Sequence, residues 1–282
     1  MKHFFYLLLL CVTGNTVAAQ DIHFFLTGGI INYQGDLQPR RFTFSQAKPF
    51  VGGGFYIEAT ERLNFRLGVL TGKISGDDKL GKFNIDRNLN FQSKVTEVHI
   101  GAEFDILNSY EHTVVPYAFA GIAGYHFNPY TLDSTGNKVY LQPLGTEGQG
   151  FYLGRKKYPL NQMAIPFGGG LKMALSDMVN IRLEAALRKL FTDYLDDVSA
   201  TYADEDELRA NNGQLAVDYS FRGDDLKQTL PYPDATSRRG NPGSKDFYYT
   251  VSLSISFRLQ GNGGNKKPGK GKLGCPVNLS GW

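Results

Sequence analysis

Side chains able to do acid–base or nucleophilic chemistry are sparse in this 282-residue sequence. A hydrolytic or acyl-transfer site needs a base placed beside a nucleophile. Beyond the first twenty residues the histidines are His23, His99, His112 and His126, and only His126 has a nearby loop hydroxyl, that of Ser134. A single pair of this kind is a weak signal, so the sequence predicts a protein that is not an enzyme and uses no cofactor.

Ligand spacing typical of a metal centre is also missing. No histidine pair or cysteine cluster has the spacing of a zinc site, and we predict no metal. The acidic residues Asp193, Asp196 and Asp197, with the acidic run 204–207, offer carboxylates that could hold Ca²⁺. Solvated loop charge is the simpler interpretation of the same residues.

Six charged side chains stand at alternate positions within otherwise apolar stretches. Alternate residues of a β-strand point to opposite faces, so the charges are expected on one face and the apolar residues on the other. In a small closed barrel the charged face would be the lumen, where the planar donor fork of arginine suits ion pairs. The predicted lumen network, with a conducting pore as the alternative, comprises Arg66, Glu97, Glu103, Arg182, Glu184 and Arg188.

The elements that must position these charges are β-strands. The stretch Asp246–Leu259 alternates apolar with small polar residues over the roughly 9–11 residues that cross a bilayer. Seven earlier stretches have a similar character, although 180–191 also contains good helix formers. The sequence therefore predicts an all-β protein, an eight-stranded antiparallel transmembrane barrel of the outer-membrane type, with strands at 22–33, 49–60, 63–74, 90–107, 116–127, 164–175, 180–191 and 246–259.

The connections between these stretches alternate in length. Short connections follow the second, fourth and sixth strands, and long ones follow the first, third, fifth and seventh. Short periplasmic turns and long external loops are typical of outer-membrane barrels, so both termini are expected in the periplasm and membrane lipid is an expected partner. Aromatic residues near strand ends are expected in interfacial girdles: Phe50, Phe127, Phe191 and Tyr194 on the outer side, Tyr110 and Tyr117 on the inner side.

The sequence divides into three segments. Residues 1–20 combine a charged start, an apolar run and small residues suited to cleavage after Ala19 or after Gln20. This pattern predicts a secretory signal peptide. Residues 21–259 form the predicted barrel, and 260–282 form a flexible, basic, periplasmic tail rich in Gly, Lys and Pro. The tail residues that could contact a partner are Lys266, Lys267, Lys270, Lys272 and Cys275, the last as a free thiol or in an intermolecular disulfide.

Several segments together carry a family resemblance: GKISGDD at 72–78, PYAFAGIAGYHFNP at 116–129, QPLGTEGQG at 142–150, IPFGGGLK at 165–172 and FTDYLDDVSATY at 191–202. The chain resembles the Bacteroidota outer-membrane barrel family (DUF6089-type) that contains the PorG-like component of the type IX secretion system. The most specific of these segments is a loop motif that includes Thr192, Asp193, Tyr194, Asp196 and Asp197.

The resemblance implies an outer-membrane component of the secretion machinery that meets a periplasmic ring of partner proteins, without catalysis. A passive porin, or a barrel that binds surface ligands through its external loops, is the alternative. The formal net charge of +3 argues against nucleic acid as a partner, and no small-molecule substrate is evident.

Overall fold

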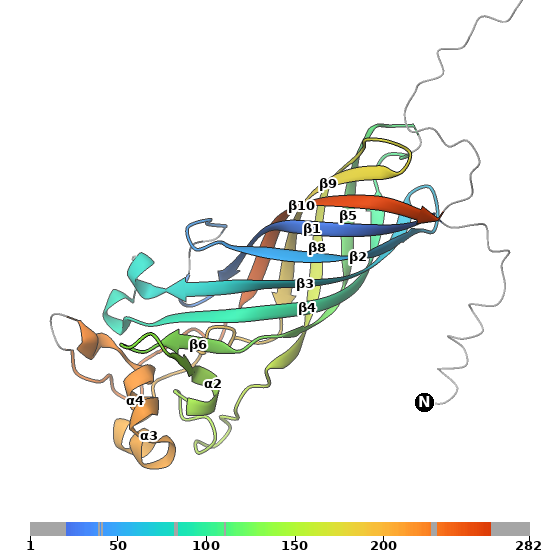
Figure 1. The fold of residues 1–282 in the computed structure, drawn as a ribbon. Coiled ribbons are helices and arrows are strands. Elements are labelled where there is room, and N and C mark those ends of the chain that lie inside the picture. The colour runs from blue at the N-terminus through green and yellow to red at the C-terminus, as the bar shows by residue number, and fades with distance from the viewer. Residues whose placement is uncertain are drawn as a thin grey trace, which may run out of the picture.

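The computed structural model describes residues 21–260, except 39, 41, 82–83, 110 and 227–229 (Figure 1). The predicted signal peptide and the predicted tail, with Lys266, Lys267, Lys270, Lys272 and Cys275, lie outside the described residues, so both stay predictions. None of the helices in the described part of the chain is long and apolar enough to cross a membrane.

Eight long strands form a closed antiparallel barrel, which confirms the predicted fold class. Neighbouring strands follow the order β3-β2-β1-β10-β9-β8-β5-β4, and the pairing of β3 with β4 closes the ring. Every strand begins and ends close to its predicted bounds. The strands are β1 (Asp21–Gln34), β2 (Lys48–Glu58), β3 (Leu63–Asp77), β4 (Asn90–Asp105), β5 (Val114–His126), β8 (Asn161–Ala174), β9 (Val179–Leu190) and β10 (Phe247–Gln260).

Strand β9 shows why alternation outweighs helix propensity here. Its sequence contains good helix formers, yet Arg182, Glu184 and Arg188 point inward and are buried, whereas Leu183 points outward and is half exposed. The strand pairs with β8 on one side and β10 on the other. A helix would place inward and outward residues on a 3.6-residue period and bring some of these charges toward the apolar outer surface.

Inward glycines let the barrel wall bend and leave room for large interior side chains. A Cβ on Gly54 of β2 would lie 2.1 Å from the carbonyl oxygen of Leu67. A Cβ on Gly170 of β8 would lie 2.2 Å from the carbonyl oxygen of Leu183 and 2.8 Å from the hydroxyl of Tyr117. The two triple-glycine runs thus allow close backbone approach in the wall.

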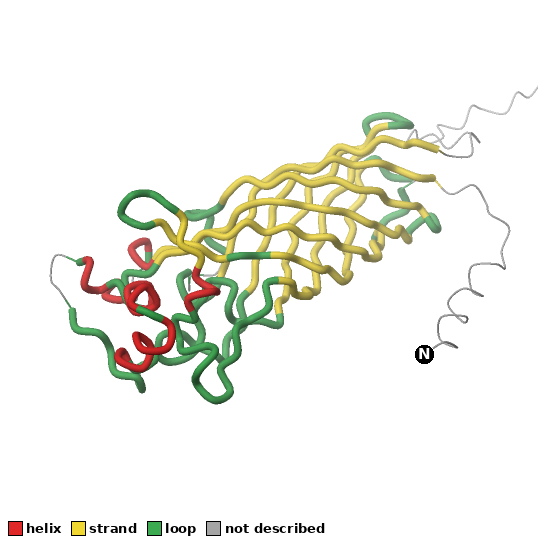
Figure 2. The backbone as a smooth tube through the Cα atoms, turned by 60° about the horizontal axis from the view of Figure 1, so that its bottom comes forward, coloured by secondary structure: helices red, strands yellow, loops and turns green. Residues whose placement is uncertain are grey.

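The long connections gather at one end of the barrel and carry their own secondary structure (Figures 1 and 2). The sequence predicted these connections only as long loops and did not predict the short elements within them. Strand β6 extends the sheet beside the upper end of β4. The additional elements are the 3₁₀ helices η1 (Asp78–Leu80), η2 (Ile85–Arg87) and η3 (Gly223–Asp225), the strands β6 (Pro129–Leu132) and β7 (Lys138–Tyr140), and the helices α2 (Leu141–Leu144), α3 (Glu205–Asn212) and α4 (Gln214–Ser220).

These connections pack into a cap whose core continues the interior of the barrel. One apolar cluster joins inward residues of the barrel, such as Ile74 and Phe91, to Leu195 and Val198 of the β9–β10 connection. The predicted aromatic girdles are therefore partly wrong. Phe50 and Tyr117 are buried inside, because their strand positions face inward. Phe127, which directly follows β5, is also buried, and Tyr194 is half-buried in the cap. Phe191 is exposed, and Tyr110 lies outside the described residues.

The close approach at Gly54 gives a direct test of the wall geometry. We expect Gly54→Ala to destabilise the barrel by about 1–3 kcal/mol, because its methyl group would overlap the backbone of β3. Gly124→Ala is the matched control, since nothing lies within 4 Å of its added Cβ. The denaturant midpoint of the gel-mobility change between folded and unfolded barrel measures both. Equal midpoints for the two variants would contradict the close packing.

Candidate functional site: a filled lumen and a packed cap

The lumen contains a layer of buried charge supplied by β3, β4, β8 and β9. Arg66 donates two hydrogen bonds to Glu184, with N–O distances of 2.6 and 3.1 Å. The hydroxyl of Tyr117 donates to the same carboxylate at 2.9 Å. The paired fork geometry makes this one of the stronger kinds of side-chain interaction.

Glu103 is the hub of the layer. Its side chain is 1% exposed, and it accepts a short hydrogen bond from Arg182. The ammonium of Lys172 lies 3.3 Å from it and the guanidinium of Arg66 lies 3.8 Å away. Lys172 also contacts Asp105 at 2.8 Å. One carboxylate thus faces three cations, and each cation has a second acidic or aromatic neighbour.

A second group of charges lies around Glu97, which is fully buried. Its carboxylate accepts a hydrogen bond from Arg188 at 3.1 Å and from the hydroxyl of Tyr248 at 2.5 Å. Nδ1 of His99 lies 3.0 Å from the same carboxylate, and Arg188 also donates to the hydroxyl of Thr250 at 2.6 Å. All six predicted lumen residues therefore lie inside the barrel, in two groups of side chains that contact one another within each group.

Sequence reasoning left five contributors out of the network: Lys172, Asp105, His99, Tyr117 and Tyr248. A signal for Lys172 exists in the period of β8. Alternate residues of this strand, from Ile165 to Met173, are apolar and point outward, which leaves Lys172 on the inner face with the glycines. The tyrosines give no comparable signal, because an aromatic ring fits either face of a barrel strand.

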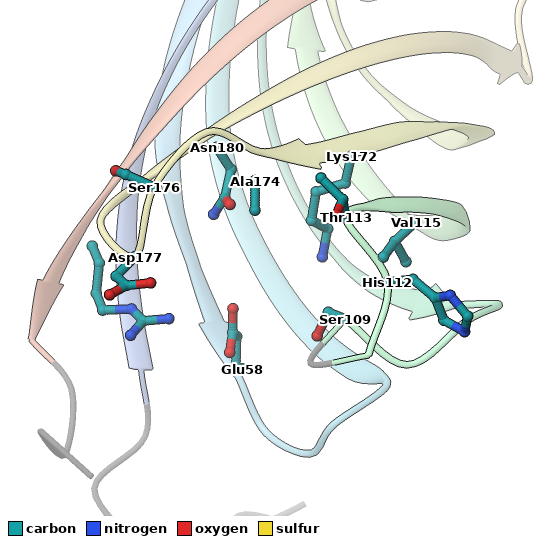
Figure 3. A pocket seen from close by; sticks show the side chains of 11 residues that line it. Glu58, Ser109, His112, Thr113, Val115, Lys172, Ala174, Ser176, Asp177 and Asn180 are labelled. Carbon is teal, nitrogen blue, oxygen red and sulfur yellow. The ribbon is translucent and has the colours of Figure 1, made fainter. Parts of the chain in front are cut away.

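Within the described residues the interior leaves little free volume. A cavity of about 30 Å³ lies among Arg66, His99, Arg182 and Arg188, which is room for very few water molecules. A second cavity of about 40 Å³ opens at the end with the short turns, where Glu58, Lys172 and Asn180 surround it (Figure 3). Neither cavity has the dimensions of an aqueous channel.

One group of possible metal ligands occurs in the described part of the chain, beside this second cavity. Ligand atoms of Asp21, His23 and Glu58 lie within 4.8 Å of one another. Nε2 of His23 is 3.1 Å from Glu58, its ring stacks on Tyr56 at 4.3 Å, and Arg258 lies 3.4 Å from Asp21. Ion pairing among these side chains accounts for the cluster without a metal, since the arginine already supplies a cation.

The loop motif after β9 forms the base of the cap. Leu195 and Val198 are buried in the apolar cluster at the cap end of the barrel. The carboxylates near them have polar partners: Asp196 accepts a short hydrogen bond from Tyr33, and Asp193 accepts one from Ser199 at 2.7 Å. Thr192 is also buried. This part of the motif packs the β9–β10 connection against the cap end of the barrel.

Asp197 joins the β9–β10 connection to the β5–β8 connection in the cap. Its carboxylate accepts hydrogen bonds from Thr146 and Tyr158, both at 2.6 Å, and lies 3.7 Å from Arg239. Arg239 also contacts Glu147 at 3.1 Å. A tighter pair of Asp78 and Arg87 lies in the β3–β4 connection, with N–O distances of 2.7 and 2.8 Å.

The interpretation of Asp193, Asp196 and Asp197 as solvated loop charge is wrong, because all three are at least 98% buried. They also do not converge on one point as Ca²⁺ ligands: each has a different protein donor. Asp204 begins α3 as its N-cap, accepting the backbone N–H groups of Asp206 and Glu207. His126 hydrogen-bonds Asn161 at 2.8 Å, on the outer face of the barrel.

Burial raises the pKa of several buried carboxyl groups in the cap. The pKa of Asp193 rises to about 7 and that of Asp197 to about 6, chiefly through loss of solvent. Burial also raises the pKa of Asp196 and of Asp246. Repulsion by a neighbouring carboxylate raises each pKa further: Asp36 acts on Asp196, and Asp196 acts on Asp246. The cap thus contains buried acidic groups whose ionisation is shifted toward higher pH.

The chain is a closed eight-stranded β-barrel with a charge-filled interior and a packed cap. It matches the family described as Domain of unknown function (DUF6089) over residues 1–233, and it belongs to that family. A comparison with curated proteins gave no match.

Three solved structures show limited similarity. Neisserial surface protein A (NspA) has 9% identity and a TM-score of 0.43, with 84% of this chain and 97% of that chain covered. Ail of Yersinia pestis, in complex with the heparin analogue sucrose octasulfate, has 8% identity and a TM-score of 0.41, with 85% of this chain and 99% of that chain covered. The outer membrane protein OprG from Pseudomonas aeruginosa has 9% identity and a TM-score of 0.39, with 85% of this chain and 97% of that chain covered. At these identities and TM-scores the likeness carries no information on ligands or partners.

Removing the hub carboxylate should be costly. We expect Glu103→Gln to destabilise the barrel by about 3–5 kcal/mol, because Arg182 and Lys172 would keep buried charges with fewer partners. Glu205→Gln is the control: it breaks a half-exposed pair with Arg209, worth at most about 1 kcal/mol. Urea midpoints of the folded barrel in lipid vesicles would show the difference. A loss of similar size in both variants would contradict a buried network.

The raised pKa values predict that acid stabilises the cap. Because the carboxyl pKa values are higher in the folded cap than in the unfolded chain, the folded state binds more protons between about pH 4 and pH 7. Resistance of the cap to protease should therefore fall as the pH rises through about 6 and 7. Asp193→Asn mimics the protonated acid and should reduce this dependence, whereas Asp224→Asn, at an exposed position, should leave it unchanged. A protease profile independent of pH would refute the prediction.

Proposed function

We propose that the protein is an outer-membrane β-barrel that crosses the bilayer through its eight strands. The observation that carries this proposal is the inverted distribution of polarity. Ion pairs fill the interior, whereas the outer wall exposes large apolar side chains, with Val98 51%, Ile100 55% and Phe104 52% exposed. An apolar outer surface facing water would be a large aggregation liability, but facing lipid it is favourable.

The height of the apolar surface supports the same proposal. It extends from Val98 on β4 to Ile106, which directly follows the end of that strand, a span of nine residues. At a rise of about 3.4 Å per residue and a tilt of about 40°, this span is roughly 23 Å tall, close to the apolar band of about 25 Å on outer-membrane barrels. A continuous polar row of Thr71, Thr96, His126 and Asn161 crosses β3, β4, β5 and β8 and marks its upper edge.

The orientation follows from the two ends of the barrel. The short turns and both ends of the described chain lie at one end, and the cap lies at the other (Figure 1). Outer-membrane barrels have their short turns in the periplasm. We therefore place the cap outside the cell and the first and last strand ends in the periplasm.

Within the outer membrane, we propose that the protein is a structural, non-enzymatic component of the type IX secretion machinery. The resemblance on the loop motif 191–202 supports this role, and the filled lumen favours a scaffold over a channel. Periplasmic ring proteins would contact the short turns and the predicted tail that follows β10.

A surface-binding barrel is the second candidate function. The observation that favours it is the cap itself, in which buried ion pairs and an apolar core hold four connections in one arrangement. Such rigid elements can present a stable surface to a ligand outside the cell.

The secretion role has a direct test in the source organism. We expect a chain lacking residues 261–282 to insert normally but to lose co-purification of periplasmic partners and type IX secretion. Deletion of the exposed β6–β7 turn, 133–137, is the control and should leave both intact. Secretion that persists after complete gene deletion would sink the proposed role.

The lumen distinguishes a scaffold from a porin. We expect the purified barrel to give no steady conductance in planar bilayers, because the ion pairs around Glu103 and Glu97 occupy its interior. Stable single-channel steps would favour the passive porin instead.

A further inference from the structure

Two lysines oppose each other on the outside of the barrel, just above the apolar surface. Lys73 of β3 pairs with Lys94 of β4 in the ladder, and both are exposed. Toward the apolar surface, the next outward-facing pair in the β3–β4 ladder is Thr71 with Thr96, and the pair after it is Val69 with Val98. Like charges directly opposite each other destabilise a sheet, so this pair is unfavourable unless an anion lies beside it.

Neither lysine has an acidic partner within the described part of the chain. All ion pairs of the described lysines involve Lys172, which points inward to Glu103 and Asp105. A single exposed lysine contributes little stability through a surface ion pair. Two adjacent lysines at the edge of an apolar surface, by contrast, concentrate positive charge at one place.

A polar groove of about 190 Å³ lies directly above this pair. Ser75 and Gln92 form the next row of the ladder, and both line the groove. Lys48 of β2 lines it as well, which adds a third ammonium group. Asp77 stands at the far end, where its carboxylate accepts the backbone N–H of Lys79 at 2.9 Å. The groove thus offers one cation, Lys48, and neutral donors beside the lysine pair, with its one acid further from the membrane.

We propose that Lys73, Lys94 and the adjoining groove bind the phosphorylated head group of an outer-leaflet glycolipid. This inference rests on the proposed outer-membrane location. Phosphate oxygens accept charge-assisted hydrogen bonds from ammonium groups, and an anion between the two lysines relieves their repulsion. Val69, Val98 and the half-exposed Leu67 and Ile100 continue the surface downward, where acyl chains of the same molecule would lie. A soluble phosphate would leave that apolar surface unused.

The test uses the purified full-length protein and a defined lipid, diphosphorylated lipid A, with its dephosphorylated form as the comparison. Native mass spectrometry measures lipid retained by the folded barrel. We expect wild type to prefer the phosphorylated lipid and Lys73→Gln/Lys94→Gln to lose about 10–30-fold in affinity, since each lysine near a charged membrane surface is worth about fivefold. Lys73→Arg/Lys94→Arg should retain binding, because the charge is kept.

The matched control removes two outward or rim lysines elsewhere, Lys189→Gln/Lys245→Gln, both exposed near the same end of the barrel. An equal loss in this control would overturn the site, because it would show general attraction to charge. Equal retention of both lipids by wild type would also overturn it. Displacement of lipid A by excess inorganic phosphate would overturn the lipid assignment.

Folding is checked separately by the gel-mobility shift of the barrel before and after heating. If the glutamine double variant fails to fold, each single variant, Lys73→Gln and Lys94→Gln, is measured alone, and an unchanged affinity in both contradicts the proposal. Failure of wild type to insert into phosphatidylcholine vesicles would count against the proposed membrane location. Insertion without preference for phosphorylated lipid would count only against the lipid site.

Discussion

The structure depends on the compensation of charge inside a closed wall. Glu103, Glu184 and Glu97 are buried in the lumen, where an ion without a partner is very unfavourable. Their partners come from distant parts of the sequence: Arg66 precedes Glu184 by 118 residues, and Glu97 meets Tyr248 from 151 residues away. The network therefore forms only when the barrel closes. It ties the register of β3, β4, β8, β9 and β10 together from the inside.

The cap depends on the same compensation, with a different balance of charge. Acidic groups outnumber their cations around Asp193, Asp196 and Asp246, and burial raises the pKa of each. Hydrogen bonds from Tyr33 and Ser199 and from the backbone of Leu195 stabilise these buried carboxyl groups in place of some of the missing cations. The cap therefore encloses these acidic groups, and their raised pKa values are the basis for the expected dependence of its stability on pH.

The outer wall separates into bands of apolar and polar side chains. Apolar rows end at a row of threonine, histidine and asparagine, and outward lysines follow immediately above. Band position is a consequence of strand register, since each row consists of residues paired across neighbouring strands. A shift of one residue in β3 relative to β4 would remove Lys73 from Lys94 and place a charge in the apolar surface.

The sequence by itself determined the barrel, its eight strands and the inward position of the charges, because a period of two places alternate side chains on opposite faces whatever their partners are. The boundaries of β1 to β5 and β8 to β10 lie within three residues of those predicted from that period and from the polar connections between the stretches. Only the tertiary structure decided which charges pair, that Lys172 and Tyr248 join them, and that Asp193, Asp196 and Asp197 are buried. Those contacts join residues far apart in the chain, across closed strands and between connections without periodicity. No local pattern records such contacts, because their energies exist only after the chain has closed on itself.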